Sequence, residues 1–202
     1  MAGNDSGSGT KGAAPVPFFL RVALLFLLIC LDTLIAKFVV FSFAAGPGTS
    51  LLYIVVAVMI VTTLWFGLWG AIAAYAGCWI GAGVLSGLSP TASLLWSVAD
   101  LLQVVIPLLA FRLLGADVSL RTRRDLAILV IFGIVLNNLV GALWGTLALG
   151  SAGLINIPTL FPLFSAWFMG NIIASVVIVP VVLWFGTPIV REHELFVKRY
   201  WS

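Results

Sequence analysis

The sequence predicts an all-α integral membrane protein with six transmembrane helices and both termini in the cytoplasm. Two observations predict the class: 62% of the 202 residues are hydrophobic and 8% are charged, and the mean hydropathy is +1.22. A soluble domain of this size could not bury so much apolar surface. A third observation, the placement of the basic residues, predicts the orientation.

Breaks rich in glycine, proline or charge separate six apolar runs. The predicted helices cover about residues 18–44, 51–66, 70–88, 89–114, 125–149 and 163–185. Residues 1–17 are expected to form a flexible cytoplasmic head, 18–188 the transmembrane domain, and 189–202 a cytoplasmic juxtamembrane tail.

Local signals support the helix limits in order along the chain. The first helix is expected to stop before Gly46-Pro47-Gly48, and a tight turn at residues 66–70 joins the second helix to the third. The third carries Gly70, Ala74, Gly77 and Gly81 close to one face, which would let a neighbouring backbone approach closely and favours a central packing role.

The later helices have capping signals. Ser89 can cap the fourth helix, with Pro90 in the tolerated first turn. Thr122 followed by Asp125 resembles a capping box that starts the fifth. A loop containing Pro158 and Pro162 is expected before the sixth, which Gly186 and Pro188 would stop.

The basic residues predict the orientation. With six spans, nine of the ten Lys and Arg residues fall on one side and only Lys37 lies toward the other. Cytoplasmic segments carry an excess of Lys and Arg, so this side is expected to be the cytoplasm of a multi-pass plasma-membrane protein.

Polar and aromatic side chains in the apolar runs are the candidate ligand-binding residues, because such groups at bilayer depth are expensive to bury. They are Trp96, Asp100, Gln103, Asn137, Asn138, Trp167 and Asn171, with Asp32 as a further candidate. All are expected between the midplane and the outer leaflet. Pro107 lacks an N–H and therefore frees the carbonyl of Gln103.

Their shared depth favours one pocket opened from outside, suited to a small aromatic or cationic molecule. Asp100 would then be the charge partner, the amides would hydrogen-bond the ligand, and Trp96 and Trp167 would stack on it. A structural interpretation stands beside this one. Asn and Gln often hydrogen-bond one helix to another, and Trp is enriched at membrane interfaces without any ligand.

Other functional classes are not expected. The only histidine, His193, lies in a charged run in the tail, which is typical of a solvated face rather than a metal site. No phosphate-binding glycine loop or Ser-His-Asp set is present. Cys30 and Cys78 are expected to pack in apolar surroundings. We therefore expect no catalytic residues, metal, cofactor or nucleic-acid partner.

Four segments of the chain resemble known membrane modules: Phe66-Gly67-Leu68-Trp69-Gly70 through Gly87, Ser93-Leu94-Leu95-Trp96, Arg123-Arg124-Asp125-Leu126, and Trp167-Phe168-Met169-Gly170-Asn171 through Val179-Pro180-Val181. They resemble membrane-associated sensor (MASE) domains of bacterial and archaeal signalling proteins. The chain's size, span number and Gly-rich third helix also resemble S components of energy-coupling-factor vitamin transporters. Both resemblances imply an outward-facing pocket formed by the fourth to sixth helices, in a module that acts only through a partner.

The sequence thus favours a small-molecule recognition module that works as an S-component-like uptake subunit. The alternatives are a sensor input module for a separate signalling protein and a structural accessory subunit of a membrane complex that packs through the Gly-bearing helix. The expected partners are the lipid bilayer, a partner membrane protein or complex, and a small-molecule ligand.

Overall fold

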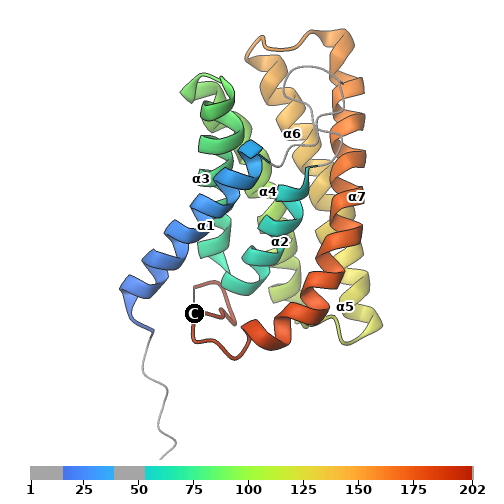
Figure 1. The fold of residues 1–202 in the computed structure, drawn as a ribbon. Helices are drawn as coiled ribbons and strands as arrows, with labels where there is room; N and C mark the ends of the chain where they lie inside the picture. Colours follow the sequence, from blue (N-terminus) through green and yellow to red (C-terminus); the bar gives the residue numbers. More distant parts are fainter. Residues whose placement is uncertain (1–15, 39–52, 202) are drawn as a thin grey trace, which may run out of the picture.

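The computed structural model describes residues 16–38 and 53–201, and in these ranges all regular structure is helical (Figure 1). The α-helices are α1 (Phe18–Phe38), α2 (Ile54–Phe66), α3 (Leu68–Cys78), α4 (Pro90–Leu114), α5 (Arg123–Ile128), α6 (Asn137–Ser151) and α7 (Ile157–Val190). Five helical stretches are long and apolar enough to cross a membrane: Phe18–Phe38, Leu68–Ser86, Pro90–Leu114, Arg123–Ser151 and Ile157–Val190. The chain is therefore a multi-pass helical membrane protein.

Two of these stretches contain π-helical turns. One, η1 (Trp79–Gly83), follows α3 and leads into a short 3-10 turn, η2 (Val84–Ser86). The other, η3 (Leu129–Leu136), joins α5 to α6 in one continuous helix. A π turn inserts extra residues into the helical repeat and often lies at a functional site. Here η3 ends directly before Asn137 and Asn138.

Several predicted limits differ from the structure. The last helix was expected from about residue 163 to 185, but α7 runs from Ile157 to Val190 and contains Pro162, Pro180 and Pro188. Transmembrane helices tolerate such prolines because neighbouring groups satisfy the freed carbonyls. The predicted end of the first helix, the following break and the first residues of the second helix lie outside the described residues, as does most of the predicted head.

The centre of the bundle is α2, not the Gly-bearing helix that the sequence favoured. Most of its side chains are buried, including those of Val55, Val56, Met59, Ile60 and Leu64. This helix has 13 residues and packs against α3, α4 and α7.

The glycines of α3 and η1 do allow close approach, as predicted. A Cβ at Gly77 or Gly81 would overlap the backbone or side chains of Asp32 and Thr33 in α1, and one at Gly70 would overlap Thr63 in α2. These glycines are thus used for packing within the chain.

Residues 191–201, the C-terminal strap, fold back under the bundle. The Val197 amide donates to the Trp65 carbonyl at 2.8 Å, and the Leu68 amide donates to the Tyr200 carbonyl at 2.8 Å. Between these contacts, Gly67 has a φ of +62°, and a Cβ there would collide with the strap. Only glycine adopts this conformation at little cost.

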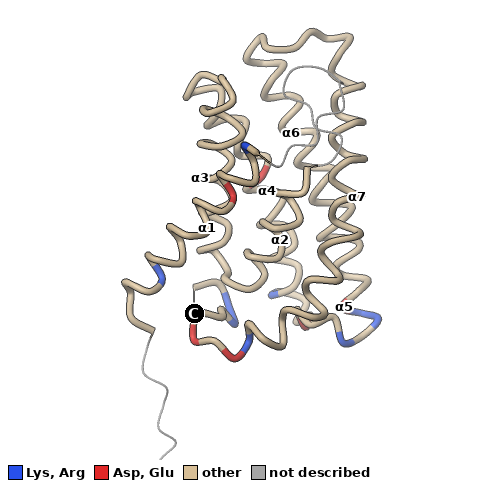
Figure 2. The backbone as a smooth tube through the Cα atoms, in the orientation of Figure 1, with Lys and Arg blue, Asp and Glu red and all other residues tan. Residues whose placement is uncertain are grey.

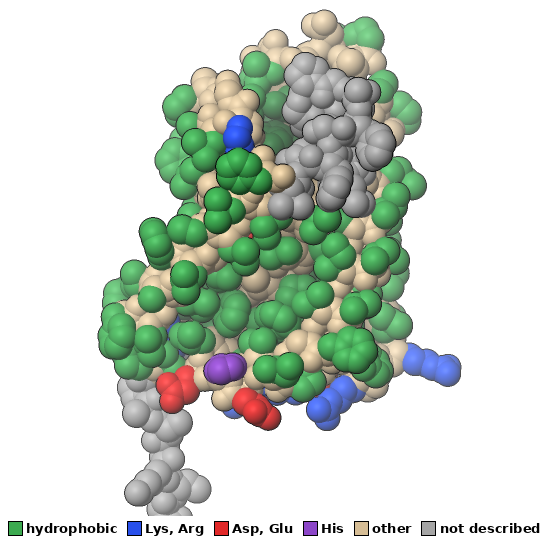
Figure 3. All heavy atoms as spheres, in the orientation of Figure 1, with side chains coloured by type: hydrophobic (Ala, Val, Ile, Leu, Met, Phe, Trp, Pro, Cys, Tyr) green, Lys and Arg blue, Asp and Glu red, His purple; other side chains and the backbone are tan. Residues whose placement is uncertain are grey.

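Charged residues concentrate at the end of the bundle that carries the strap, which we call the basic end (Figure 2). Arg21 donates to the Trp201 carbonyl, Arg112 to the carbonyls of Val197 and Arg199, and Arg191 pairs with Asp117. Lys37 instead donates to the carbonyl of Leu85 in η2, at the other end of the bundle. In Figure 3 the side of the bundle between the two ends is mostly covered by hydrophobic side chains.

Candidate functional site

A hydrogen-bonded polar cluster ties three helices together inside the bundle. The Gln103 side chain in α4 donates through Nε2 to Oδ1 of Asn138 in α6 at 2.8 Å. Asn138 in turn donates through Nδ2 to Oγ of Ser175 in α7 at 3.2 Å, and to the Ile134 carbonyl one turn earlier. We call Gln103, Asn138 and Ser175 the polar floor.

Asn137 uses the carbonyl that Pro107 leaves free. Pro107 cannot donate to the Gln103 carbonyl, and Nδ2 of Asn137 donates to it at 3.2 Å instead. This confirms the sequence-based expectation that the carbonyl would be available. Both asparagines are fully buried, so neither amide faces lipid.

Two tryptophans pair on the side of the floor away from the basic end. The rings of Trp96 in α4 and Trp167 in α7 have centroids 5.6 Å apart. The Trp167 ring lies against Gly145 of α6, where a Cβ would overlap it, and the Gln103 side chain lies against Gly141 in the same way. Small residues on α6 thus create the room for both the aromatic pair and the floor.

Asp100 and Asn171 lie between these two layers. Each comes one helical turn after its tryptophan and about one turn before a floor residue, since α4 and α7 run in the same direction. Each is only 1% exposed. Oδ1 of Asp100 and both side-chain polar atoms of Asn171 have no hydrogen-bond partner among the described residues.

Asp32 extends this middle layer toward α1. It is buried, with neither carboxylate oxygen hydrogen-bonded within the described residues, and it lies close enough to Asp100 for the two carboxyl groups to interact electrostatically. Cys78 and Tyr53 are also buried and lie near Asp100. Neither Cys78 nor Tyr53 was among the predicted site residues. Only the fold brings them to Asp100.

Buried polar groups in native proteins nearly always have partners, and each unsatisfied one costs about 1–3 kcal/mol. Polar atoms without a partner among the described residues come here from four helices: Asp32 in α1, Asp100 in α4, Asn137 in α6 and Asn171 in α7. Such a set can hydrogen-bond a polar molecule that enters between the Trp96–Trp167 pair and the polar floor. We call this layer of buried polar side chains the inner chamber.

Some of the predicted residues therefore contact each other directly, whereas others only lie in neighbouring layers of the bundle. Gln103 contacts both Asn137 and Asn138, and Trp96 contacts Trp167. Asp100 and Asn171 share a layer without a hydrogen bond between them. Within residues 16–38 and 53–201, no three His, Cys, Asp or Glu side chains meet in a way that could hold a metal ion.

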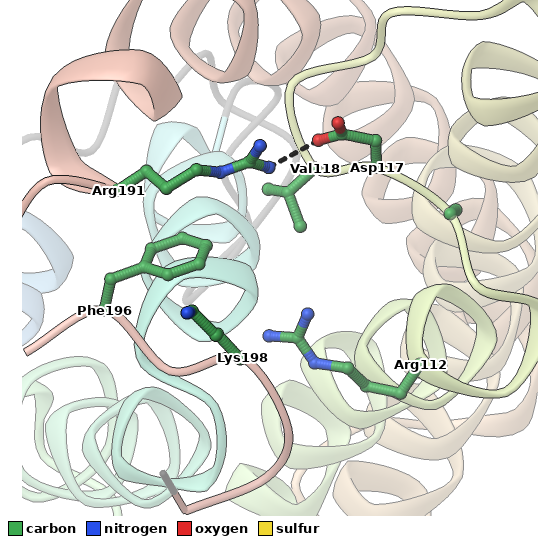
Figure 4. A pocket seen from close by; sticks show the side chains of 7 residues that line it. Arg112, Asp117, Val118, Arg191, Phe196 and Lys198 are labelled. Atoms are coloured by element: carbon green, nitrogen blue, oxygen red, sulfur yellow. Dashed lines mark hydrogen bonds and ion pairs between the residues drawn. The ribbon is translucent and has the colours of Figure 1, made fainter. Parts of the chain in front are cut away.

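A pocket at the basic end was not predicted. It has a volume of about 290 Å³ and is lined by Arg112, Ala116, Asp117, Val118, Arg191, Phe196 and Lys198 (Figure 4). In the sequence analysis the basic residues predicted only the orientation of the protein in the membrane. These residues come together only because the strap folds back onto the bundle, and no sequence motif predicts that fold.

The Asp117 carboxyl at this pocket is ionised more readily than usual. Burial raises the pKa of Asp117, but the hydrogen bond and charge of Arg191 and the hydrogen bonds from Ser119 outweigh burial, so the pKa lies below its ordinary value of 3.8. The pocket therefore contains a carboxylate paired with Arg191 at neutral pH.

Comparison of the chain with protein-family models, curated proteins and solved structures finds no match.

Proposed function

We propose that this protein is a membrane-embedded recognition module that binds a small molecule in the inner chamber and acts through a partner protein. The observation that carries the proposal is the middle layer. A carboxyl group and a carboxamide are held at 1% exposure, with polar atoms that find no partner among residues 16–38 and 53–201, between an aromatic pair and a hydrogen-bonded floor. Interhelical hydrogen bonding alone gives a reason for Gln103 and Asn138 but not for Asp100 and Asn171.

The chamber chemistry indicates the class of ligand. A cationic or hydrogen-bond-donating group would pair with Asp100, and Asn171 would both donate to and accept from the ligand. A flat apolar part would contact the indoles of Trp96 and Trp167. The ligand is therefore a small amphipathic molecule with a positive or donor-rich end.

The proposed topology has six spans, with α2 as the short central one, and cytoplasmic termini. The positive-inside rule supports it, because the side chains of Arg21, Arg112, Arg124 and Arg191 make their contacts at one end of the bundle while Lys37 binds at the other. The inner chamber would then open toward the outside.

Uptake, as in S components, is the first candidate for the biological role. Sensing is the second, and a specific observation favours it. The single helix α7 carries Trp167 and Asn171 in the chamber and continues to Val190, where the strap begins. A ligand that shifts α7 would move the strap contacts on α2, α3 and α4, so binding would be reported at the basic end.

The third candidate, a structural subunit that docks through the Gly-bearing helix, has less support. Gly70, Gly77 and Gly81 already contact α1 or α2 of the same chain. That face is covered.

Native mass spectrometry of the protein purified from its own membrane tests the proposal. We expect a small molecule to stay bound to the wild type and to be lost from Asp100→Asn and Trp96→Ala. The control is Asn156→Leu, because Asn156 is exposed at the start of α7 and its side chain makes no capping bond. Equal retention by all four proteins would contradict the chamber assignment.

Proteins that co-purify separate the two roles. An ATPase with a coupling subunit would support uptake, whereas a kinase or cyclase would support sensing. A fixed-ratio enzyme complex with no small molecule bound would instead support the structural role.

A further inference from the structure

The pocket at the basic end is distinct from the inner chamber and is built from three separate segments. Arg112 comes from the last turns of α4, and Ala116, Asp117 and Val118 come from the loop after it. Arg191, Phe196 and Lys198 come from the strap. Figure 4 shows these side chains surrounding one opening, with Arg191 directed to Asp117 across it.

The guanidinium of Arg112 is held in a fixed position. Nε donates to the Arg199 carbonyl at 2.7 Å, and Nη2 donates to the carbonyls of Val197 and Leu64 at 2.8 and 3.1 Å. Nη1 donates to no group in the described part of the chain. Neutral carbonyls do not cancel the charge, so Arg112 supplies a pre-oriented cation with a free donor.

The other charges leave the pocket positive. Three cations, Arg112, Arg191 and Lys198, face one carboxylate, Asp117, which gives a net charge of +2. Asp117 is already paired with Arg191. Lys198 is exposed and makes no ion pair within residues 16–38 and 53–201, so its ammonium is available to an anion.

We propose that this pocket binds a phosphate group. Arg and Lys are the side chains that hold phosphate, through forked and point-charge hydrogen bonds respectively. Phe196 adds an apolar wall for the organic part of a phosphate ester. Its ring lies against the Arg191 guanidinium, with 5.7 Å between Cζ of Arg191 and the ring centroid. The volume is at the small end of ligand pockets.

The phosphate could belong to a soluble ester or to an anionic lipid at the membrane surface. Two measurements separate these sources. Calorimetric titration of inorganic phosphate into the protein in phosphatidylcholine nanodiscs tests the soluble form. Native mass spectrometry after reconstitution in mixed phosphatidylcholine and phosphatidic acid tests whether the acidic lipid is retained selectively.

Three variants test the residues. Lys198→Gln removes an exposed cation whose ammonium makes no hydrogen bond to the described residues. It should weaken phosphate or phosphatidic acid binding by about tenfold, the loss expected for one charge-assisted hydrogen bond. Asp117→Asn frees Arg191 and should strengthen binding, provided that hydrogen exchange shows the strap still docked in this variant. The matched control is Arg123→Gln, an exposed cation at the start of α5 that does not line the pocket, and it should change binding less than twofold, since an exposed charge at a distance is screened.

The results decide between the alternatives. Tight binding of inorganic phosphate supports a soluble ligand, and selective retention of phosphatidic acid without it supports a lipid. The proposal is overturned if the wild type binds neither probe, or if Arg123→Gln weakens binding as much as Lys198→Gln, because the attraction would then come from the charge of the whole basic end. The proposed function of the inner chamber is unaffected by either result.

Discussion

Replacing Asn138 with leucine should destabilise the bundle by an amount that the polar floor allows us to work out. The substitution removes the bond accepted from Gln103 and the bond donated to Ser175, which link α6 to α4 and to α7. Hydrogen bonds between transmembrane helices contribute about 0.6 kcal/mol each on average, and leaving the buried Gln103 amide unpaired adds about 1–3 kcal/mol. We expect a loss of about 2–4 kcal/mol in the free energy of unfolding.

A double-mutant cycle checks the physical reason. Gln103→Leu in the Asn138→Leu background removes the unpaired amide, so the double variant should be more stable than the sum of the single losses predicts, by about 1–2 kcal/mol. Unfolding by sodium dodecyl sulfate in mixed micelles, followed by circular dichroism, measures each free energy. Asn156→Leu is the control and should change little.

Additive losses in this cycle would refute a direct Gln103–Asn138 interaction. An Asn138→Leu variant as stable as the wild type would refute the larger claim that the floor holds α4, α6 and α7 together.

Three further predictions follow from local geometry. Pro107→Ala restores a donor for the Gln103 carbonyl, so Asn137→Leu should cost less stability in that background than in the wild type, measured by the same unfolding assay. Asp125→Ala removes the carboxylate that accepts from Thr122 and should cost about 1–2 kcal/mol, and a loss no larger than that of an exposed α5 position would contradict the capping box. The pKa of Asp117 is lowered in the folded protein, so the contribution of Asp117 to strap docking should be complete above pH 3.8 and should disappear as the pH falls through the lowered pKa. Hydrogen exchange of the strap amides should show this pH dependence, and Asp117→Asn should abolish the dependence.

Features that depend on a few neighbouring residues could be predicted from the sequence. The Ser89 hydroxyl accepts from the Ala92 amide at 3.3 Å, and the Thr122–Asp125 capping box forms in both directions. The free carbonyl of Gln103 followed from Pro107 alone. In each case covalent geometry fixes the result before any tertiary contact.

For features that depend on which helices pack together, the sequence could predict candidate residues but not their arrangement. The sequence identified Trp96, Asp100, Trp167 and Asn171 because polar and aromatic groups are unusual in apolar runs, but it could not say that they form successive layers. Hydropathy also cannot tell a central helix from a peripheral one, because lipid and protein interiors are equally apolar. Nothing in the sequence therefore indicated that α2 would lie at the centre of the bundle.

The strap was beyond sequence-based reasoning for a different reason. Its contacts are mainly to backbone carbonyls and amides, which every residue possesses, so its sequence carries no signature of where it docks. Gly67 was recognised as part of a turn, yet its closeness to the strap depends on residues more than a hundred positions away. The pocket at the basic end was missed for the same reason.

The accessibility of position 171 tests the central claim most directly. In a background without Cys30 and Cys78, Asn171→Cys should react with a membrane-impermeant cationic thiosulfonate added from outside if, as we propose, the chamber binds small cations from that side. Ile173→Cys lies on the same helix but is 51% exposed on the outer surface of the bundle, where lipid should protect it. Reaction at 171 and none at 173 is the predicted result. No reaction at 171, or reaction only from the cytoplasmic side, would contradict an outward-facing recognition chamber.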